Sequence, residues 1–502
     1  MRTSGILMHI TSLPGPYGIG TLGKSAHEFV DFLHRAGQSY WQILPLTPTG
    51  YGDSPYQSCS TFAGNHYLID LDALIGAGLL TEAEANAPVW YSREEKADFG
   101  LLYNSRLAVL RQAFARFPGS MEFDEFCRKN SDWLPDFTLF MALKDHFSGK
   151  PWYEWDEPLR FRKPAALEGV REEFREDLRF YAFVQYLFDA QWNALRTYAH
   201  EKGVRLIGDV PIYVPYDSVE VWSDPALFQL DESLRPTDVA GVPPDAFTAD
   251  GQLWGNPLYR WDVMARDGYR WWIRRLGAAG KWYDTVRLDH FRGFESYWAV
   301  PYGAPNARGG HWVKGPGMDF IRTLHRELPE LSIIAEDLGY LTEEVLALRD
   351  DSGYPGMKVL QFAFDSREPS DYLPHTYIRN TVCYTGTHDN MTTRQWLETG
   401  TAEMRDYAGA YMHLTEEEGM VRGMIRTAMS SVSDLCVVPM QDYLDLGASA
   451  RMNFPGTLSD SNWTWRAKDG MIKTELADEI YTLTALYDRL GSQKPEPAVA
   501  SR

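Results

Sequence analysis

The chain is poor in cysteine and has neither a long apolar run nor an excess of positive charge. Its four cysteines in 502 residues are far apart and form no CxxC pair, which argues against a disulfide framework or a zinc site. No uninterrupted apolar run approaches transmembrane length, and the first twenty residues lack the small-residue cleavage pattern of a signal peptide. With 49 Lys and Arg against 69 Asp and Glu, the net charge of −20 makes nucleic acids and anionic membranes unexpected partners. We therefore expect a protein of a reducing compartment, such as the cytoplasm.

Eight short apolar runs bounded by turn residues recur along the chain, and several are followed by helix-like patterns. Alternating strands and helices predict a parallel sheet, and eight such strands predict a closed (β/α)8 barrel. Hydrophobic residues make up 44% of the sequence, which is enough for a large core. The eight runs are Gly5–Leu13, Tyr40–Leu46, Val204–Val214, Asp284–Phe291, Ser332–Asp337, Met357–Phe364, Thr381–Asp389 and Asp434–Met440.

Three of the predicted helices have recognisable ends. Ser25 and Glu28 have the spacing of a capping box at a helix start, and Gly37 has the place of a helix stop. A second helix is expected to begin after Thr342, and a third to cover Tyr186–Glu201.

The spacing of the eight strands is uneven, which predicts insertions into one domain spanning residues 1–490. Mainly helical subdomains are expected at about 72–200 and 215–280, and residues 491–502 are expected to be disordered. Residues 241–259 are dense in Gly, Pro, Asp and Asn, and read as a loop beside the site. Too few residues follow the eighth strand for a C-terminal β-domain.

Three of the predicted strands finish in an acid. DTVRLDHF, SIIAED and CYTGTHDN contribute Asp289, Glu336 and Asp389 in chain order. Acids at the carboxyl ends of parallel barrel strands converge at one mouth, and convergent carboxylates suit glycosidic bond chemistry. Each motif alone is more often a structural ion pair, a helix cap or a satisfied polar pair, but all three at successive strand ends favour a catalytic site.

Residues two apart in a strand share a face, so Arg287 is expected beside Asp289. We expect the guanidinium to lower the pKa of Asp289 and keep it ionised, as a nucleophile requires. Glu336 follows apolar residues, which raise the pKa of a carboxyl and suit a general acid. Asp389 and His388 could bind sugar hydroxyls.

At this point the motifs resemble a known group of enzymes. RLDH, AED and THDN look like the catalytic strands of the α-amylase superfamily, and IGDVPIYV with Asp209 looks like its first conserved region. Longer segments resemble the 4-α-glucanotransferases of glycoside hydrolase family 77, the amylomaltases or disproportionating enzymes, over about Gly5 to Leu490. These segments are ILMHITSLPGPYGIGTLG, WQILPLTPTGYGDSPYQSCSTFAGNHYLIDL, DAFTADGQLWGNPLY, ARMNFPGT and NWTWR.

The resemblance implies a role for each matching residue. Asp289 would be the nucleophile, Glu336 the acid and base, and Asp389 the transition-state stabiliser. The residues implied to bind substrate or support the site are Arg287, His388, Asp209, Tyr56 as a donor-side platform, Ser54 and Asp53 beneath it, Trp254 on a loop at 251–256 over the acceptor side, and Asn462 with Trp463.

The implied activity is transfer of α-1,4-glucan segments from maltooligosaccharides, or from starch or glycogen fragments, to glucose, maltose or another glucan. It requires no cofactor and no metal. A retaining mechanism predicts that the two reacting carboxyls lie about 5–5.5 Å apart. The alternatives are an α-amylase-like retaining hydrolase and a catalytically inactive starch-binding protein. The implied Trp254 loop and the missing C-terminal domain favour the transferase. A bacterial cytoplasm is the expected location, with a mature plastid form as the alternative.

Overall fold

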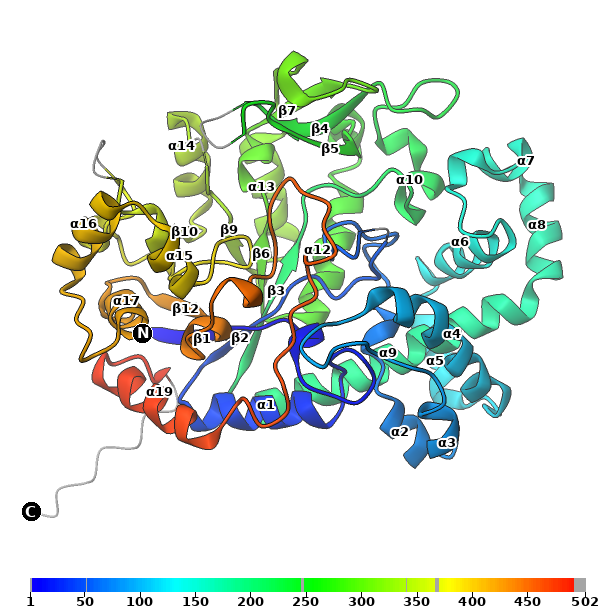
Figure 1. Ribbon diagram of the computed structural model, residues 1–502. Helices are drawn as coiled ribbons and strands as arrows, with labels where there is room; N and C mark the ends of the chain where they lie inside the picture. Colours follow the sequence, from blue (N-terminus) through cyan, green and yellow to red (C-terminus); the bar gives the residue numbers. More distant parts are fainter. Residues whose placement is uncertain (1, 51, 245–247, 340, 366–369, 492–502) are drawn as a thin grey trace, which may run out of the picture.

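The computed structural model describes residues 2–50, 52–244, 248–339, 341–365 and 370–491. Within them, eight parallel strands form one sheet in the order β10-β11-β12-β1-β2-β3-β6-β9, which follows the chain around a barrel (Figure 1). Each predicted run overlaps one of these strands, so the prediction of a (β/α)8 barrel is confirmed. The strands are β1 (Thr3–Leu7), β2 (Tyr40–Gln42), β3 (Arg205–Val210), β6 (Thr285–Leu288), β9 (Ser332–Ala335), β10 (Gly356–Val359), β11 (Thr381–Tyr384) and β12 (Leu435–Pro439).

The barrel closes between β9 and β10 through one main-chain bond and one carboxylate. The N–H of Ala335 donates to the carbonyl of Pro355 at 3.0 Å. Asp337 Oδ1 accepts from the N–H of Met357 at 2.7 Å, and its Oδ2 accepts from Arg349 Nη1 at 2.7 Å. A buried strand N–H must find a partner, and here an acid side chain supplies part of the missing ladder.

The helix after β1 starts earlier than its sequence predicts. Helix α1 (Lys24–Arg35) begins after Gly23, so the predicted capping box of Ser25 and Glu28 is wrong. A Cβ at Gly23 would lie 2.1 Å from Asp70 Oδ2, so a glycine is needed where the helix begins against this carboxyl. Gly37 follows the helix with a φ of +67°, as a helix stop does.

The other two predicted helices are present, but one of them begins earlier than predicted. Thr342 Oγ1 accepts from the N–H of Val345 at 3.4 Å and caps α14 (Glu343–Ser352). Helix α9 (Arg175–Glu201) contains the predicted segment but begins a full three turns before Tyr186.

The chain between β2 and β3 forms helices that pack on one flank of the barrel (Figure 1). They are α2 (Leu71–Gly76), α3 (Glu82–Ala85), α4 (Phe99–Ala115), α5 (Met121–Lys129), α6 (Leu134–His146), α7 (Glu157–Arg160), α8 (Pro164–Glu173) and α9.

Residues 215–280 differ from the mainly helical expectation because they contain two strands. Strands β4 (Asp238–Val242) and β5 (Gln252–Pro257) join β7 (Ser296–Pro301) and β8 (His311–Lys314) in an antiparallel sheet of order β5-β4-β7-β8 above the barrel (Figure 1). The helices of this region are α10 (Val219–Ser223), α11 (Trp261–Arg266) and α12 (Arg270–Trp282). Part of the predicted loop at 241–259, residues 245–247, lies outside the described residues.

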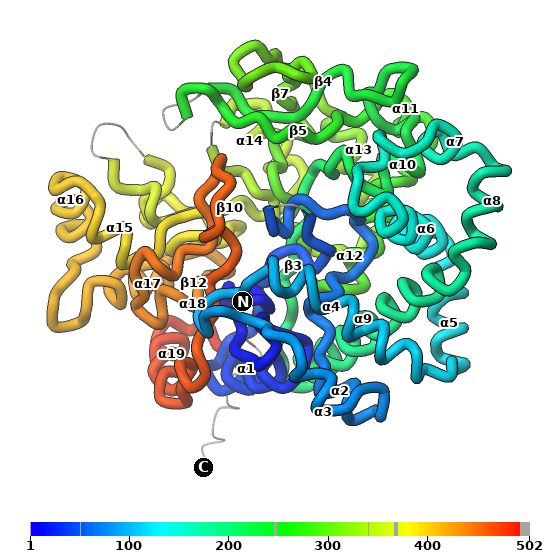
Figure 2. Tube along the Cα trace, turned by 45° about the vertical axis from the view of Figure 1, so that its right-hand side comes forward, coloured from blue at the N-terminus to red at the C-terminus, as the bar shows by residue number. Residues whose placement is uncertain are grey.

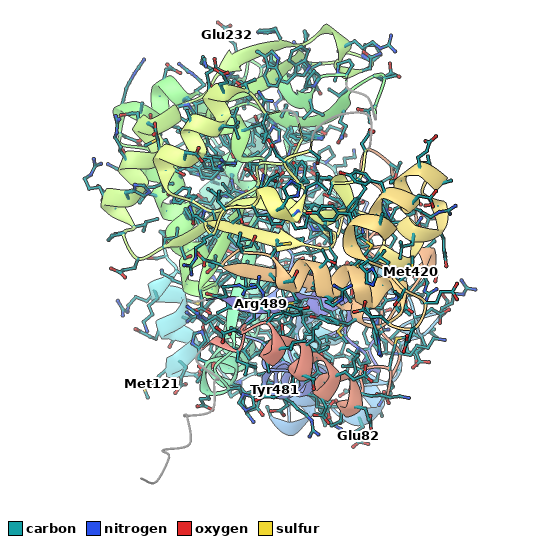
Figure 3. The ribbon with its side chains drawn as sticks, turned by 90° about the vertical axis from the view of Figure 1, so that its left-hand side faces the viewer. Glu82, Met121, Glu232, Met420, Tyr481 and Arg489 are labelled. Atoms are coloured by element: carbon teal, nitrogen blue, oxygen red, sulfur yellow. The ribbon has the colours of Figure 1, made fainter. Side chains whose placement is uncertain are left out.

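A buried arginine after α19 (Thr474–Leu486) binds main-chain carbonyls next to the starts of β1 and β12. Arg489 is 0% exposed and donates to the carbonyls of Thr3, Met429, Ser431 and Ser433 at 2.7–3.0 Å (Figure 3). These bonds join the segment after the last described helix to the first residue of β1 and to residues 429–433. The expected disordered tail lies outside the described residues from 492 onwards. The remaining helices are α13 (Gly317–Glu327), α15 (Thr393–Thr399), α16 (Ala402–Met412), α17 (Met420–Ser430), α18 (Met440–Tyr443) and α19 (Thr474–Leu486).

None of the described helices is both long and apolar enough to span a bilayer.

Candidate active site

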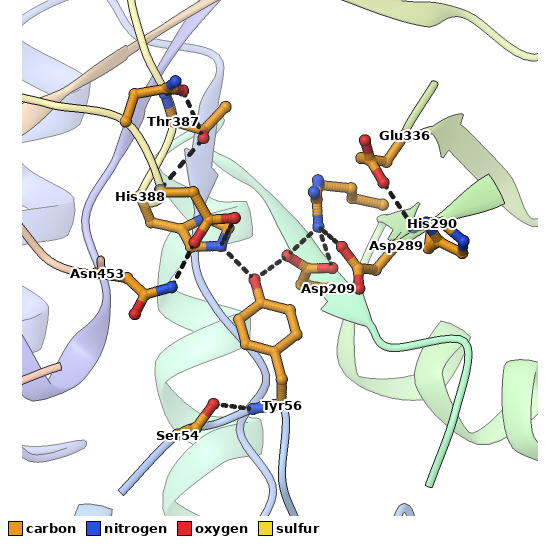
Figure 4. Close-up of polar contacts among 12 residues, drawn as sticks. Ser54, Tyr56, Asp209, Asp289, His290, Glu336, Thr387, His388 and Asn453 are labelled. Atoms are coloured by element: carbon orange, nitrogen blue, oxygen red, sulfur yellow. Dashed lines mark hydrogen bonds and ion pairs between the residues drawn. The ribbon is translucent and has the colours of Figure 1, made fainter. Parts of the chain in front are cut away.

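Four acids gather at the carboxyl ends of the barrel strands (Figure 4). Asp209 lies near the end of β3, Asp289 directly follows β6, and Glu336 directly follows β9. Asp389 lies a few residues beyond β11. The three predicted acids therefore meet at one mouth, as their positions after successive strands indicate.

Arg287 joins two of these acids. Asp209 and Arg287 are direct neighbours across β3 and β6, so their side chains share a face. The Arg287 Nη1 donates to both oxygens of Asp209, at 2.9 and 2.8 Å, and to Asp289 Oδ1 at 2.9 Å. The side chains of Arg287 and Asp209 are 4% and 0% exposed, whereas that of Asp289 is 28% exposed. Asp289 is thus the open end of a buried ion-pair network.

Burial changes the expected ionisation of Asp289. Its pKa is raised to about 8 because burial disfavours the carboxylate, and the nearby charges of Asp209, Glu336 and Asp389 add to this effect. Arg287 acts in the opposite direction but does not prevail. Arg287 thus lowers this pKa as expected, but the net pKa is raised because burial, which strand spacing does not reveal, outweighs the guanidinium.

Glu336 is held by main-chain groups. Its Oε2 accepts from the N–H of His290 at 2.7 Å and its Oε1 from the N–H of Leu338 at 2.9 Å. His290 has a left-handed backbone with a φ of +49°, which turns the chain after Asp289 toward this carboxyl. Burial raises the pKa of Glu336, as predicted, and Arg287 and the two N–H groups limit the shift.

Tyr56 and His388 form a second layer against Asp209. The Tyr56 hydroxyl donates to Asp209 Oδ2 at 2.7 Å and lies 2.9 Å from His388 Nε2 (Figure 4). Burial raises the pKa of Tyr56 well above its usual value and lowers that of His388, so both are neutral near pH 7. Because the phenol proton goes to Asp209, the imidazole carries its own proton on Nε2 and donates it toward the Tyr56 oxygen. The two rings stack at 5.3 Å, and Trp463 packs against both.

Asp389 is fixed by the segment that follows β12. Asn453 Nδ2 donates to Asp389 Oδ1 at 2.6 Å, and Arg451 Nη2 donates to the Asp389 carbonyl at 2.8 Å. His388 Nε2 lies 3.5 Å from Asp389 Oδ2, and the Asp389 side chain is 42% exposed. Sequence reasoning missed Asn453, although the motif ARMNFPGT that contains it was recognised.

Trp254 lies beside the acids, but on a strand. The predicted loop at 251–256 is wrong, because Trp254 belongs to β5, where it follows the paired residues Gln252 and Leu253 at an irregularity of the register. Its ring meets the His290 ring edge-on at 4.9 Å, and Tyr213 at 6.2 Å. The side chain thus contacts the residue whose N–H holds Glu336.

Two further predicted residues support loops instead of touching the acids. Ser54 Oγ accepts from the N–H of Tyr56 at 3.3 Å (Figure 4). Asn462 Oδ1 accepts from the N–H of Phe454 at 3.1 Å, and its Nδ2 donates to the Thr457 carbonyl at 3.1 Å. Asp53, next to Ser54, has a φ of +58° and a pKa raised to about 6, mainly by burial.

Among the described residues, no three His, Cys, Asp or Glu side chains are placed to hold a metal ion. The four acids instead accept hydrogen bonds from protein donors. Arg287 donates to Asp209 and Asp289, a main-chain N–H donates to Glu336, and an amide side chain donates to Asp389.

The barrel and its convergent carboxylates define a carbohydrate-active (β/α)8 enzyme. The family model described as 4-α-glucanotransferase matches residues 8–473. The 4-α-glucanotransferase of Clostridium butyricum is 49% identical over 96% of this chain and 100% of its own. That of Thermus thermophilus is 47% identical over 97% of this chain and 99% of its own. A solved amylomaltase from Streptococcus agalactiae, in complex with acarbose, superposes with a TM-score of 0.95 at 42% identity over 97% of this chain and 100% of its own. The chain belongs to the 4-α-glucanotransferases of glycoside hydrolase family 77.

Proposed function

We propose that this enzyme transfers segments of α-1,4-glucan by a retaining double displacement, with Asp289 as nucleophile and Glu336 as general acid and base. The observation that carries the assignment is the difference between their partners. Asp289 binds a guanidinium at 2.9 Å, which favours its ionised form. Among the described residues, the hydrogen bonds to Glu336 come from main-chain N–H groups. When the cluster holds one proton, that proton therefore belongs on Glu336.

The first step breaks the donor glycosidic bond. Asp289 attacks the anomeric carbon while Glu336 protonates the glycosidic oxygen, and the reducing-end fragment departs. A covalent glycosyl ester remains on Asp289. In the second step Glu336 takes the proton from a sugar 4-hydroxyl, which attacks the anomeric carbon and restores both Asp289 and an α-1,4 bond. Donors would be maltooligosaccharides or starch and glycogen fragments, and acceptors glucose, maltose or another glucan.

The neighbouring residues position the reacting sugar. The Asp389 side chain is 42% exposed, and it would bind hydroxyls of the distorted sugar more tightly in the transition state. Asp209 and His388 would bind the same ring, and the Tyr56 ring would form its platform. Arg287 would hold the nucleophile in place, while Ser54 and Asn462 support the loops that carry Tyr56 and the segment after β12.

The rival activity is hydrolysis by the same first step, with water as the acceptor. Trp254 favours transfer, because an indole ring beside His290 can hold an acceptor sugar and exclude water from the ester.

Incubation with pure maltotriose distinguishes glucan transfer from hydrolysis and from simple saccharide binding. Transfer produces glucose together with a ladder of longer maltodextrins at an unchanged number of reducing ends. Reducing ends that rise without longer products would replace this proposal by the hydrolase. Absence of any turnover would favour a saccharide-binding protein.

A cytoplasmic location agrees with the cysteine chemistry. All four cysteines are free thiols in the structure, as is usual for proteins of a reducing compartment. Fractionation of the source cells followed by activity measurement would test the location.

A further inference from the structure

A large cavity lies beside β3, between the helices α9 and α12 and the segment around the end of α5. Its volume is 540 Å³, within the range of small-molecule sites. Helices α9 and α12 both contact β3 and touch each other, and Figure 2 shows them beside that strand. Gly277 and Ala278 line the α12 side, where small side chains leave the space open.

Aromatic rings form much of the wall. Phe62 and Trp133 are stacked, with centroids 6.5 Å apart and planes 20° from parallel. Phe188 and Trp282 meet deeper in the wall at 5.4 Å. Flat rings of this kind match the apolar faces of pyranose rings.

The polar lining combines both signs of charge in equal number. The cationic side chains are Arg274 and Lys281, and the acidic ones are Asp132 and Asp189. Arg275 and Asp209 also border the cavity, but both are buried and bound, Arg275 to the carbonyls of Pro211 and Ile212 and Asp209 to Arg287. This balance favours a neutral ligand over an anion or a cation.

Arg274 and Asp189 supply polar groups of both kinds beside the aromatic wall. The Arg274 guanidinium lies 4.8 Å from the Phe62 centroid. Asp189 accepts from Asn193 at 3.0 Å, and burial raises its pKa. A ligand with several hydroxyls would supply both donors and acceptors to such groups.

The cavity is adjacent to the catalytic residues. Tyr56 and Asp209, which belong to the catalytic cluster, border the cavity, and the exposed residues Asp132, Asn193 and Lys281 also line it. A glucan held there would keep donor or acceptor chains close to the acids and raise their effective concentration.

We propose that this cavity is a second saccharide site, which binds a short α-1,4-glucan outside the catalytic cleft. The choice of glucan as ligand rests on the proposed function. The site itself rests on the volume, the stacked aromatic wall and the balanced polar groups.

The test counts bound maltotriose per chain by equilibrium dialysis. All proteins carry Asp289→Asn to prevent turnover. Ala278→Trp places an indole in the cavity, whereas Ala265→Trp, the matched control, places it on an exposed face of α11. We expect the Ala278→Trp protein to bind one maltotriose fewer at saturation than the control.

Trp133→Ala, which removes half of the stacked pair, should show the same loss and decides the question if Ala278→Trp fails to fold. Equal stoichiometry in all variants would overturn the proposal. Displacement of the additional saccharide by inorganic phosphate would also overturn it, in favour of an anion site. This binding test is independent of turnover. If the Asp289→Asn protein binds maltotriose at both sites but the wild-type protein does not disproportionate maltotriose, only the proposed function is contradicted.

Discussion

The carboxyl ends of β6 and β9 present two acids of one cluster in opposite ways. Asp289 follows β6 and binds Arg287, a permanent charge that it shares with Asp209. Glu336 follows β9 and binds the N–H groups of His290 and Leu338, which carry no charge. Burial raises the pKa of both, so the difference in partners decides which acid keeps a proton. In the proposed mechanism this difference makes Asp289 the nucleophile and Glu336 the proton donor, although both follow neighbouring strands of one barrel.

The largest effect is expected from Asp289→Asn. An amide cannot form the glycosyl ester, so kcat for maltotriose disproportionation should fall by at least about 10⁴-fold, and hydrolysis should fall with it. Product ladders from the purified variant measure both. A melting temperature within a few degrees of the wild type would show that the fold persists. Substantial remaining activity would show that the nucleophile is misassigned.

Glu336→Gln should reduce maltotriose turnover by about 10²–10⁴-fold, because proton transfer to the leaving sugar is lost. A donor with a fluoride leaving group, such as α-maltotriosyl fluoride, needs no such proton. Fluoride release in the first turnover should therefore recover in Glu336→Gln but remain absent in Asp289→Asn. Equal loss of fluoride release in both variants would erase the proposed difference between the two acids.

Asn453→Ala should have a smaller effect, about tenfold or more on kcat, since it removes a hydrogen bond to the Asp389 carboxylate at 2.6 Å. Asn104→Ala, at an exposed site on α4 where the amide donates only to its own helix, is the matched control. If the two variants have the same kcat, Asn453 does not position Asp389 for the reaction.

The smallest effect concerns stability against pH. Burial raises the pKa of Asp289 from 3.8 to about 8 and also raises that of Glu336, so the folded pair shares one proton, which we assign to Glu336, that the unfolded chain has lost. Stability therefore falls as pH rises through the window from about 4 to 8. Asp289→Asn removes this loss, so its melting temperature should exceed that of the wild type by more at pH 8.5 than at pH 5, by on the order of a few degrees. A larger advantage at pH 5 would contradict the sign of the shift.

The strands and their terminal acids were predictable because both follow from local pattern. An apolar run ends where a polar residue appears, and the barrel rule then brings Asp289, Glu336 and Asp389 together. Arg287 was predictable for the same reason, since strand alternation alone places it beside Asp289.

The missed features depend on contacts between distant segments. Asn453 reaches Asp389 from 64 residues away, and nothing near either residue signals that approach. The pKa of Asp289 depends first on its burial and then on the charges of Arg287 and the neighbouring acids, which come from other strands. Trp254 was expected on a loop because its segment is rich in Gly and Pro, but pairing of Gln252, Leu253 and Pro257 with β4 makes the segment a strand. In each case tertiary structure overrides the local signal.

The most direct test of the central claim is to identify the residue that carries the glycosyl ester. Glu336→Gln should form the ester from α-maltotriosyl fluoride and then accumulate it, because no base remains to activate the acceptor. Digestion and mass spectrometry should place a maltotriosyl group on the peptide that contains Asp289. A maltotriosyl group on Asp209 or Asp389, or a product of inverted anomeric configuration formed without any ester, would contradict the account.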